Sequence, residues 1–186
     1  MQIGTGYRLR TAFGALVAAT AMAVLTAGPA GAADTTTTFT VTGGALLITA
    51  PATADLGSGG PGSPISSALG AVTVTDGRAL LAPTWAATVT SGDFTTGGAT
   101  ADETIANTLV DYWSGPATAT TGSGTTFAPG QANAAAAVPL SETPTAFALT
   151  AGVGNNSATW NPTLVVNVPA QAVGGLYTGT VTHSMA

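Results

Sequence analysis

The sequence of 186 residues lacks cysteine and lysine. Its charged residues are 3 arginines and 8 Asp or Glu residues, and it has 1 histidine. Without cysteine it can form neither disulfides nor thiolate metal sites. Without a basic surface it cannot neutralise phosphates, so nucleic acid is excluded as a partner. The absence of lysine excludes Schiff-base chemistry. The acidic residues lack the alternating spacing of a calcium loop, and we expect no cofactor and no metal.

Charged residues make up only 6% of the chain, as in some disordered proteins, but 45% of the residues are apolar. That apolar content favours a packed core over disorder.

The N-terminus has the three regions of a secretory signal peptide. Arg8 and Arg10 are followed by an apolar run over residues 11–25 and by the small residues Ala30-Gly31-Ala32. A membrane anchor is the alternative, but an apolar run of about 14 residues is shorter than the roughly 20 needed to span a bilayer. We therefore expect residues 1–32 to be a signal peptide and residues 33–186 to be one exported domain. Its net charge would be 1 − 8 = −7.

Apolar and polar residues alternate with a period of two in several short segments, which is typical of half-buried strands. The clearest are residues 72–75, 84–90, 163–168 and 177–185, and weaker ones are 38–41, 45–49, 109–113 and 146–150. Loops rich in Gly, Pro and Ser are expected at 57–64, 92–99, 115–124 and 152–156, and one helical turn within 131–138. About eight short strands between such turns predict an all-β fold, an antiparallel β-sandwich.

Four side chains are candidates for contact with a ligand: Trp85, Tyr112, Trp113 and His183. Trp85 shares a strand face with Val89, which favours core packing. Tyr112 and Trp113 are adjacent and must point to opposite sides of a strand, so we expect one of them to be exposed and able to stack on a sugar ring. An aromatic that covers the rim of the core is the alternative. His183, the only imidazole, is expected to be a core or rim residue.

No set of residues in the sequence predicts an enzyme. A Cys–His pair is impossible, and the Gly-x-Ser-x-Gly turn of a serine hydrolase is absent. A glycosidase would need two carboxylates about 5–10 Å apart, for which the sequence offers Asp93, Glu103, Asp111 and Glu142 without placing them. A non-enzymatic protein is therefore the first expectation, and a wall-active hydrolase remains an alternative.

Two segments together resemble the WxL domain of Gram-positive cell-surface proteins. In the first, Val74-Thr75-Asp76-Gly77-Arg78 precedes Trp85-Ala86-Ala87, and Asp93-Phe94 follows. In the second, Val168-Pro169-Ala170 precedes Gly175-Leu176-Tyr177-Thr178-Gly179. Ala87 stands where the family has Leu, and His183 and Met185 stand at the second Trp and Leu positions. The chain is thus similar to a degenerate WxL-like domain of the kind found in secreted actinobacterial proteins.

The resemblance implies a secreted protein that associates non-covalently with the cell wall, with peptidoglycan as its ligand. A Thr-rich surface of low charge fits polysaccharide better than an ionic partner. A structural or adhesive subunit that assembles with itself or another surface protein through edge strands is the alternative.

Overall fold

The computed structural model describes residues 31–98 and 100–186. The chain divides into two units, residues 1–39 and 40–186. The predicted signal peptide and its alternative, a membrane anchor, fall almost wholly on residues 1–30, outside the described part. Within the first unit, residues 31–39 hold no helix or strand. None of the described helices is long and apolar enough to cross a membrane.

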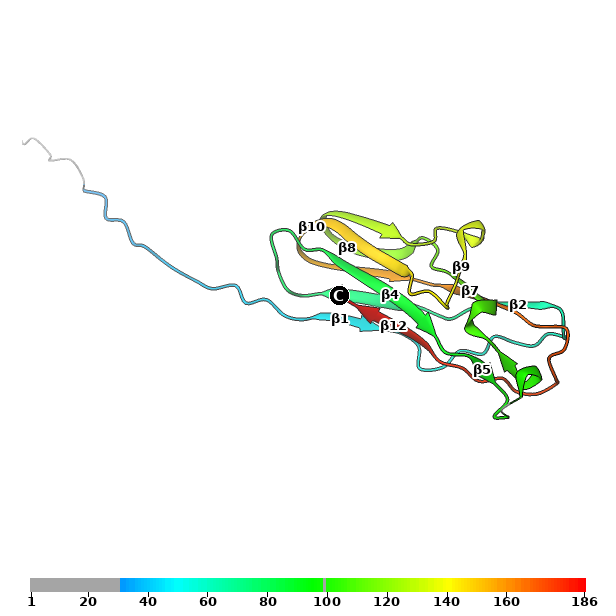
Figure 1. Cartoon of the computed structure of the whole chain (residues 1–186). Helices are drawn as coiled ribbons and strands as arrows, with labels where there is room; N and C mark the ends of the chain where they lie inside the picture. Colours follow the sequence, from blue (N-terminus) through cyan, green and yellow to red (C-terminus); the bar gives the residue numbers. More distant parts are fainter. Residues whose placement is uncertain (1–30, 99) are drawn as a thin grey trace, which may run out of the picture. The chain divides into compact units, whose positions relative to one another are not determined.

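The described part of the second unit is built from antiparallel strands in two main sheets (Figure 1). We call the larger one sheet A. Its strands run in the order β1 (Leu46–Thr49), β3 (Val72–Asp76), β10 (Thr145–Trp160), β4 (Trp85–Ser91) and β12 (Val181–Met185), and β8 (Ala117–Pro129) also pairs with β10.

Sheet B has four strands in the order β2 (Pro64–Ala68), β11 (Thr163–Asn167), β7 (Val110–Trp113) and β9 (Val138–Pro139). A small ribbon pairs β5 (Phe94–Thr95) with β6 (Thr104–Ile105), and three short 3-10 turns complete the described elements: η1 (Ala101–Glu103), η2 (Asn107–Leu109) and η3 (Ala134–Ala136). The predicted all-β antiparallel fold is confirmed. The described residues form twelve strands, more than the eight expected, partly because three of these strands are only two residues long.

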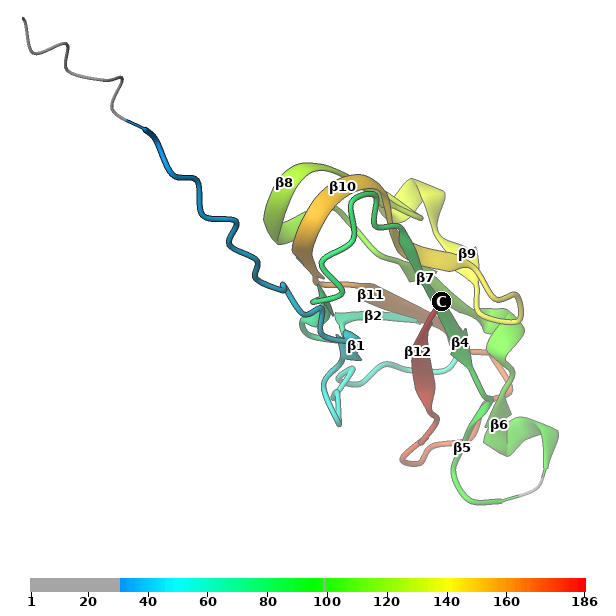
Figure 2. The same cartoon turned by 90° about the vertical axis from the view of Figure 1, so that its left-hand side faces the viewer.

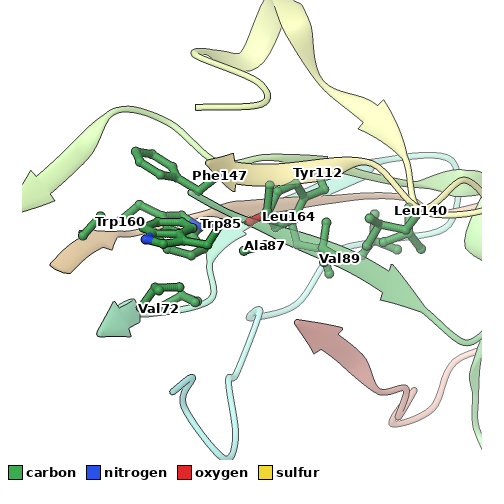
Figure 3. Close-up of a cluster of buried hydrophobic side chains, with 14 of the residues drawn as sticks. Val72, Trp85, Ala87, Val89, Tyr112, Leu140, Phe147, Trp160 and Leu164 are labelled. Atoms are coloured by element: carbon green, nitrogen blue, oxygen red, sulfur yellow. Dashed lines mark hydrogen bonds between the residues drawn. The ribbon is translucent and has the colours of Figure 1, made fainter. Parts of the chain in front are cut away.

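The inner faces of both sheets share one apolar core, much of which is drawn in Figure 3. Trp85, Ala87 and Val89 of β4 point inward, whereas Thr88 and Thr90 are half-buried on the other face. The predicted alternation is therefore confirmed on this strand, and β3, β11 and β12 alternate in the same way. Alternation of this kind fixes which residues face the solvent.

Strands β8 and β10 run side by side as one long, bent ribbon (Figures 1 and 2). The loops predicted at 115–124 and 152–156 are wrong, because most of these residues belong to β8 and β10. Gly122, Gly124 and Gly154 have positive φ and lie where the register between the two strands shifts. Glycines in these strands therefore mark bulges, which bend a ribbon without ending it.

The strand predicted at residues 38–41 is also wrong, since these residues pair with no described strand. Phe39 and Val41 are 90% and 75% exposed. The last predicted strand is shorter than expected, because β12 begins at Val181 and the chain before it makes only an isolated bridge between Thr178 and Thr95.

Candidate functional site

The Asp-Gly-Arg segment at the end of β3 forms a polar cluster with the first Trp of β4. The Arg78 guanidinium donates two hydrogen bonds to the Asp76 carboxylate, from Nε to Oδ1 at 2.9 Å and from Nη2 to Oδ2 at 2.8 Å. Asn156 of β10 donates from Nδ2 to Asp76 Oδ2 at 3.4 Å and accepts from Trp85 Nε1 at 2.9 Å. We name these four residues the Trp85 cluster.

The Trp85 cluster is a structural device in which each charge and each amide has a partner. Asp76 is 1% exposed, and the hydrogen bond from Arg78 lowers the pKa of its carboxyl. Arg78 Nη2 also donates to the Thr84 carbonyl at 2.9 Å, which ties the turn between β3 and β4 to the pair. A buried carboxylate is stable only with such partners. The motif that suggested the resemblance therefore performs a packing role here.

A second cluster joins the two sheets through aromatic residues. Trp160 Nε1 donates to Tyr112 Oη at 3.2 Å, and Tyr112 Oη lies 3.2 Å from His183 Nε2. Because the hydroxyl oxygen already accepts from Trp160, its proton is available for a neutral His183 ring. Phe147 stacks on Trp160 with ring centroids 4.9 Å apart. We name Trp160, Tyr112 and His183 the His183 chain.

Burial keeps the His183 chain uncharged. Desolvation lowers the pKa of His183 to about 4 and raises the pKa of Tyr112 above its ordinary value. Trp160 ends β10 at a position where the register with β8 shifts. The expectation that His183 lies in the core or at its rim is confirmed, since the residue is half-buried.

His183 also lines a cavity of about 550 Å³ between the inner face of sheet B and the edge of sheet A. Leu164 and Val166 of β11 and Val181 of β12 contribute apolar walls. Two segments without regular strands, residues 50–59 and 172–180, complete the lining. The volume is within the range of small-ligand pockets. The walls of the cavity are mainly apolar.

The structure does not bring the four predicted contact residues to one surface. Trp85 is 3% exposed and Tyr112 is fully buried, so neither ring offers a face to a sugar, which corrects their assignment as binding residues. Trp113 alternates with Tyr112 and is half-buried on the outer face of sheet B. Sugar contact through Trp113 stays a prediction, and His183 faces the cavity instead.

The outer face of sheet A carries rows of hydroxyl groups that cross four strands. The registers align Thr49 with Thr73 and Thr159, and Thr75 with Ser157 and Thr121. Thr73 and Thr159 share a hydrogen bond of 2.9 Å, and Thr121 and Ser157 share one of 2.8 Å. None of these side chains is charged. We name these six residues the hydroxyl face.

Three of the four acidic residues considered for hydrolysis are engaged separately. Asp93 accepts from the Asn107 backbone, Asp111 accepts from Asn167, and hydrogen bonds from Thr100 lower the pKa of Glu103. A general acid needs the opposite shift. In the described part of the chain, His, Asp and Glu form no group of three that could hold a metal.

Sequence reasoning missed the cavity and the cross-strand alignment of the hydroxyls. Alternation identified Thr73 and Thr75 as outward-facing, but only the registers show which hydroxyl rows they join. The cavity depends on how residues 50–59 and 172–180 run. Residues 50–59 and 172–176 have no periodic pattern, and residues 177–180 were predicted as part of a strand. A comparison with models of known protein families finds no match to this chain. A search of curated proteins finds no match either.

Proposed function

We propose that this chain is a secreted, non-enzymatic cell-surface protein that associates non-covalently with the bacterial cell wall through a WxL-like β-sandwich. Peptidoglycan is the proposed ligand. The predicted signal peptide and the two segments that resemble the WxL domain support the proposal. The observation that carries it is the hydroxyl face, an uncharged array on the outer side of sheet A.

The chemistry of the hydroxyl face suits a glycan. Each Thr or Ser hydroxyl can donate one hydrogen bond and accept two, as sugar hydroxyls do. Neighbouring strands are about 4.8 Å apart, and outward residues on one strand are roughly 6.7 Å apart, so the array offers regularly spaced partners to an extended chain. Thr75 and Thr121 are exposed and available for such contacts.

The test is co-sedimentation of residues 33–186 with purified peptidoglycan sacculi. A Thr75→Val/Thr121→Val variant removes two exposed hydroxyls and keeps β-branched side chains in the strands. We expect saturable binding by the parent chain and about 30-fold weaker binding by this variant, since each of the two lost hydrogen bonds costs on the order of 1 kcal/mol. Thermal unfolding would show that the variant keeps its fold.

The matched control changes the outer face of sheet B. Ser66→Val/Thr163→Val removes two hydroxyls from β2 and β11 and should leave binding unchanged. A Trp113→Ala variant tests the alternative contact on that same sheet. If only Trp113→Ala abolishes binding, the hydroxyl face is not the contact surface. If the parent chain does not sediment with sacculi, the wall-binding proposal is wrong.

A structural subunit that assembles through edge strands is the second candidate, and one observation favours it. Strand β12 pairs with β4 along one side and with no described strand along the other. A sheet edge of this kind offers main-chain hydrogen bonds to an added strand. Light scattering that detects concentration-dependent oligomers of residues 33–186 would support this function.

A further inference from the structure

The cavity beside His183 has an elongated apolar floor. Leu164, Val166 and Val168 alternate along β11 and just beyond its end, and all three line the cavity. Four residues of extended chain separate the first from the last, so this row is about 13 Å long. Val166 pairs with Ile65 of β2, which also lines the cavity. The floor therefore suits an extended apolar chain.

The two ends of this floor differ in their surroundings. Leu164 lies opposite Tyr112 in the register, and the Tyr112 hydroxyl lies 3.2 Å from His183 Nε2, so the His183 ring lies at the inner end. A backbone hydrogen bond of 3.1 Å closes a turn over residues 169–172, and the segment 172–176 lines the other end. Most of that segment is exposed. The cavity thus has a polar inner end and an outer end that opens to solvent.

His183 presents a free hydrogen-bond donor at the inner end. Trp160 Nε1 donates to the Tyr112 hydroxyl, so that hydroxyl donates its single proton to His183 Nε2. A neutral imidazole that accepts at one nitrogen carries its proton on the other, here Nδ1, which makes no hydrogen bond with the described residues. Within the described chain, Gln131 Oε1 is the only fully buried side-chain nitrogen or oxygen atom that lacks a partner. His183 Nδ1 is therefore open to a small molecule, and its ring lines the cavity.

The other titratable side chains of the lining are engaged or lie at the mouth. Tyr177 Oη lies 3.0 Å from the backbone carbonyl oxygens of Asp102 and Val173, to which it donates. Asp55 is exposed and accepts a backbone hydrogen bond within its own segment. Arg78 is the only Lys or Arg after residue 32, and it is bound in the Trp85 cluster. An anionic head group would thus find no cation at the cavity, and its burial would be costly.

We propose that the cavity binds an uncharged amphiphile with one extended alkyl chain, whose hydroxyl or carbonyl oxygen accepts a hydrogen bond from His183 Nδ1. The alkyl chain lies along Leu164, Val166 and Val168. A fatty alcohol or the methyl ester of a fatty acid has this chemistry. Binding is favourable because the chain leaves water for an apolar space. The site does not involve the hydroxyl face, so this inference and the wall-binding proposal can fail independently.

The first test is a titration of isotope-labelled residues 33–186 with 1-decanol, followed by NMR shifts of the backbone amides. The extended chain of 1-decanol is comparable in length to the apolar row. We expect saturable shifts that concentrate at residues 164–168 and 181–183, with the amides of the hydroxyl face unchanged. The absence of saturable shifts, or saturable shifts confined to other residues, would overturn the proposal.

A matched pair of variants tests whether the cavity holds the alkyl chain. Val181→Trp places a large ring in the cavity, whereas Thr182→Trp places the same ring on the exposed face of the same strand. We expect Val181→Trp to bind 1-decanol at least about tenfold more weakly, because part of the alkyl chain is no longer buried. Thr182→Trp should bind like the parent chain.

Equal binding by Val181→Trp and the parent chain would show that the alkyl chain lies elsewhere. Thermal unfolding checks that both variants keep their fold. If Val181→Trp does not fold, the residues whose amides shift in the parent chain still decide where the ligand binds.

Two measurements test the polar end. The chain has one histidine, so nitrogen NMR of the ring identifies its tautomer directly. We expect the proton on Nδ1 in the free protein and a shift of that nitrogen when 1-decanol is added. A proton on Nε2 would contradict the proposed hydrogen bond. Decanoate, the anion with the same chain, should bind at least about tenfold more weakly at neutral pH. Equally tight binding of decanoate would show that the head group stays in water and not at His183.

Discussion

The Trp85 cluster and the His183 chain are built alike but end differently. In both, a buried indole N–H donates to a polar side chain on another strand. The Trp85 cluster ends in the bidentate Asp76–Arg78 pair, where each charge is matched. The His183 chain ends at a neutral ring on β12, beside a cavity and an unpaired sheet edge. The comparison indicates that the polar groups of the Trp85 cluster are matched within it, whereas the His183 chain ends on a strand that pairs with a described strand on one side alone.

The largest difference between the two clusters is expected when the Asp76 carboxylate is removed from the Trp85 cluster. Asp76→Ala removes the carboxylate that pairs with the Arg78 guanidinium and accepts from the Asn156 amide, and leaves them only the Thr84 and Gly154 carbonyls. We expect a loss of about 3 kcal/mol in the free energy of unfolding, measured with denaturant. Asp55→Ala is the control, since Asp55 is exposed and accepts only from the Gly57 backbone. A change below about 1 kcal/mol for Asp76→Ala would show that the pair is not an anchor.

The two clusters should also lose stability in different pH ranges. The pKa of His183 is lowered by burial from 6.5 to about 4, so protonation favours the unfolded chain as the pH falls from 6.5 towards 4. We expect a decline on the order of 2 kcal/mol over this range, because His183 is only partly shielded from water. The pKa of Asp76 lies below 3.8, so its contribution is lost only as the pH falls further.

A His183→Gln variant separates these two ranges. Its free energy of unfolding should stay flat between pH 6.5 and about 5 and should fall, like that of the parent chain, as the carboxylates with lowered pKa, Glu103 and Asp76, become protonated at lower pH. Denaturant unfolding at a series of pH values measures both. A parent chain whose stability does not change between pH 6.5 and 4 would show that His183 is solvated.

The smallest expected effect is a difference in the free energy of unfolding between two variants, in which Trp is replaced by Phe in one cluster or in the other. Trp85→Phe leaves the buried Asn156 oxygen without a donor, whereas Trp160→Phe leaves the Tyr112 hydroxyl still bonded to His183. The loss of ring volume is the same in both variants. We expect Trp85→Phe to be the more destabilising by about 1 kcal/mol in denaturant unfolding. Equal losses would mean that the two indoles are equivalent.

Much of the fold could be predicted because a period of two is a local property. The inward set on β4 and the outward threonines of β3 follow from alternation alone. The glycines of β8 and β10 could not be interpreted in this way, because glycine occurs both in loops and in β-bulges. The pairing that bends these strands is non-local, so only the registers distinguish the two.

The site was predicted less well, since burial depends on contacts between strands far apart in the sequence. Tyr112 and Trp113 were correctly assigned to opposite faces, and Trp85 was correctly assigned to the core. That Tyr112 bonds both Trp160 and His183 depends on sheets A and B meeting at that point. Residues 38–42 have a strand pattern without a partner in the described chain, so pattern alone predicted a strand there.

The most direct test of the comparison is amide hydrogen exchange on the monomeric form of residues 33–186. If the Trp85 cluster lies between paired strands and β12 pairs along one side alone, amides of β10 from Asn156 to Trp160 should exchange slowly, and those of Val181, His183 and Met185 should exchange fastest among the sandwich strands. Equal protection of both sets in the monomer would contradict the account, because the edge of β12 would then already be covered.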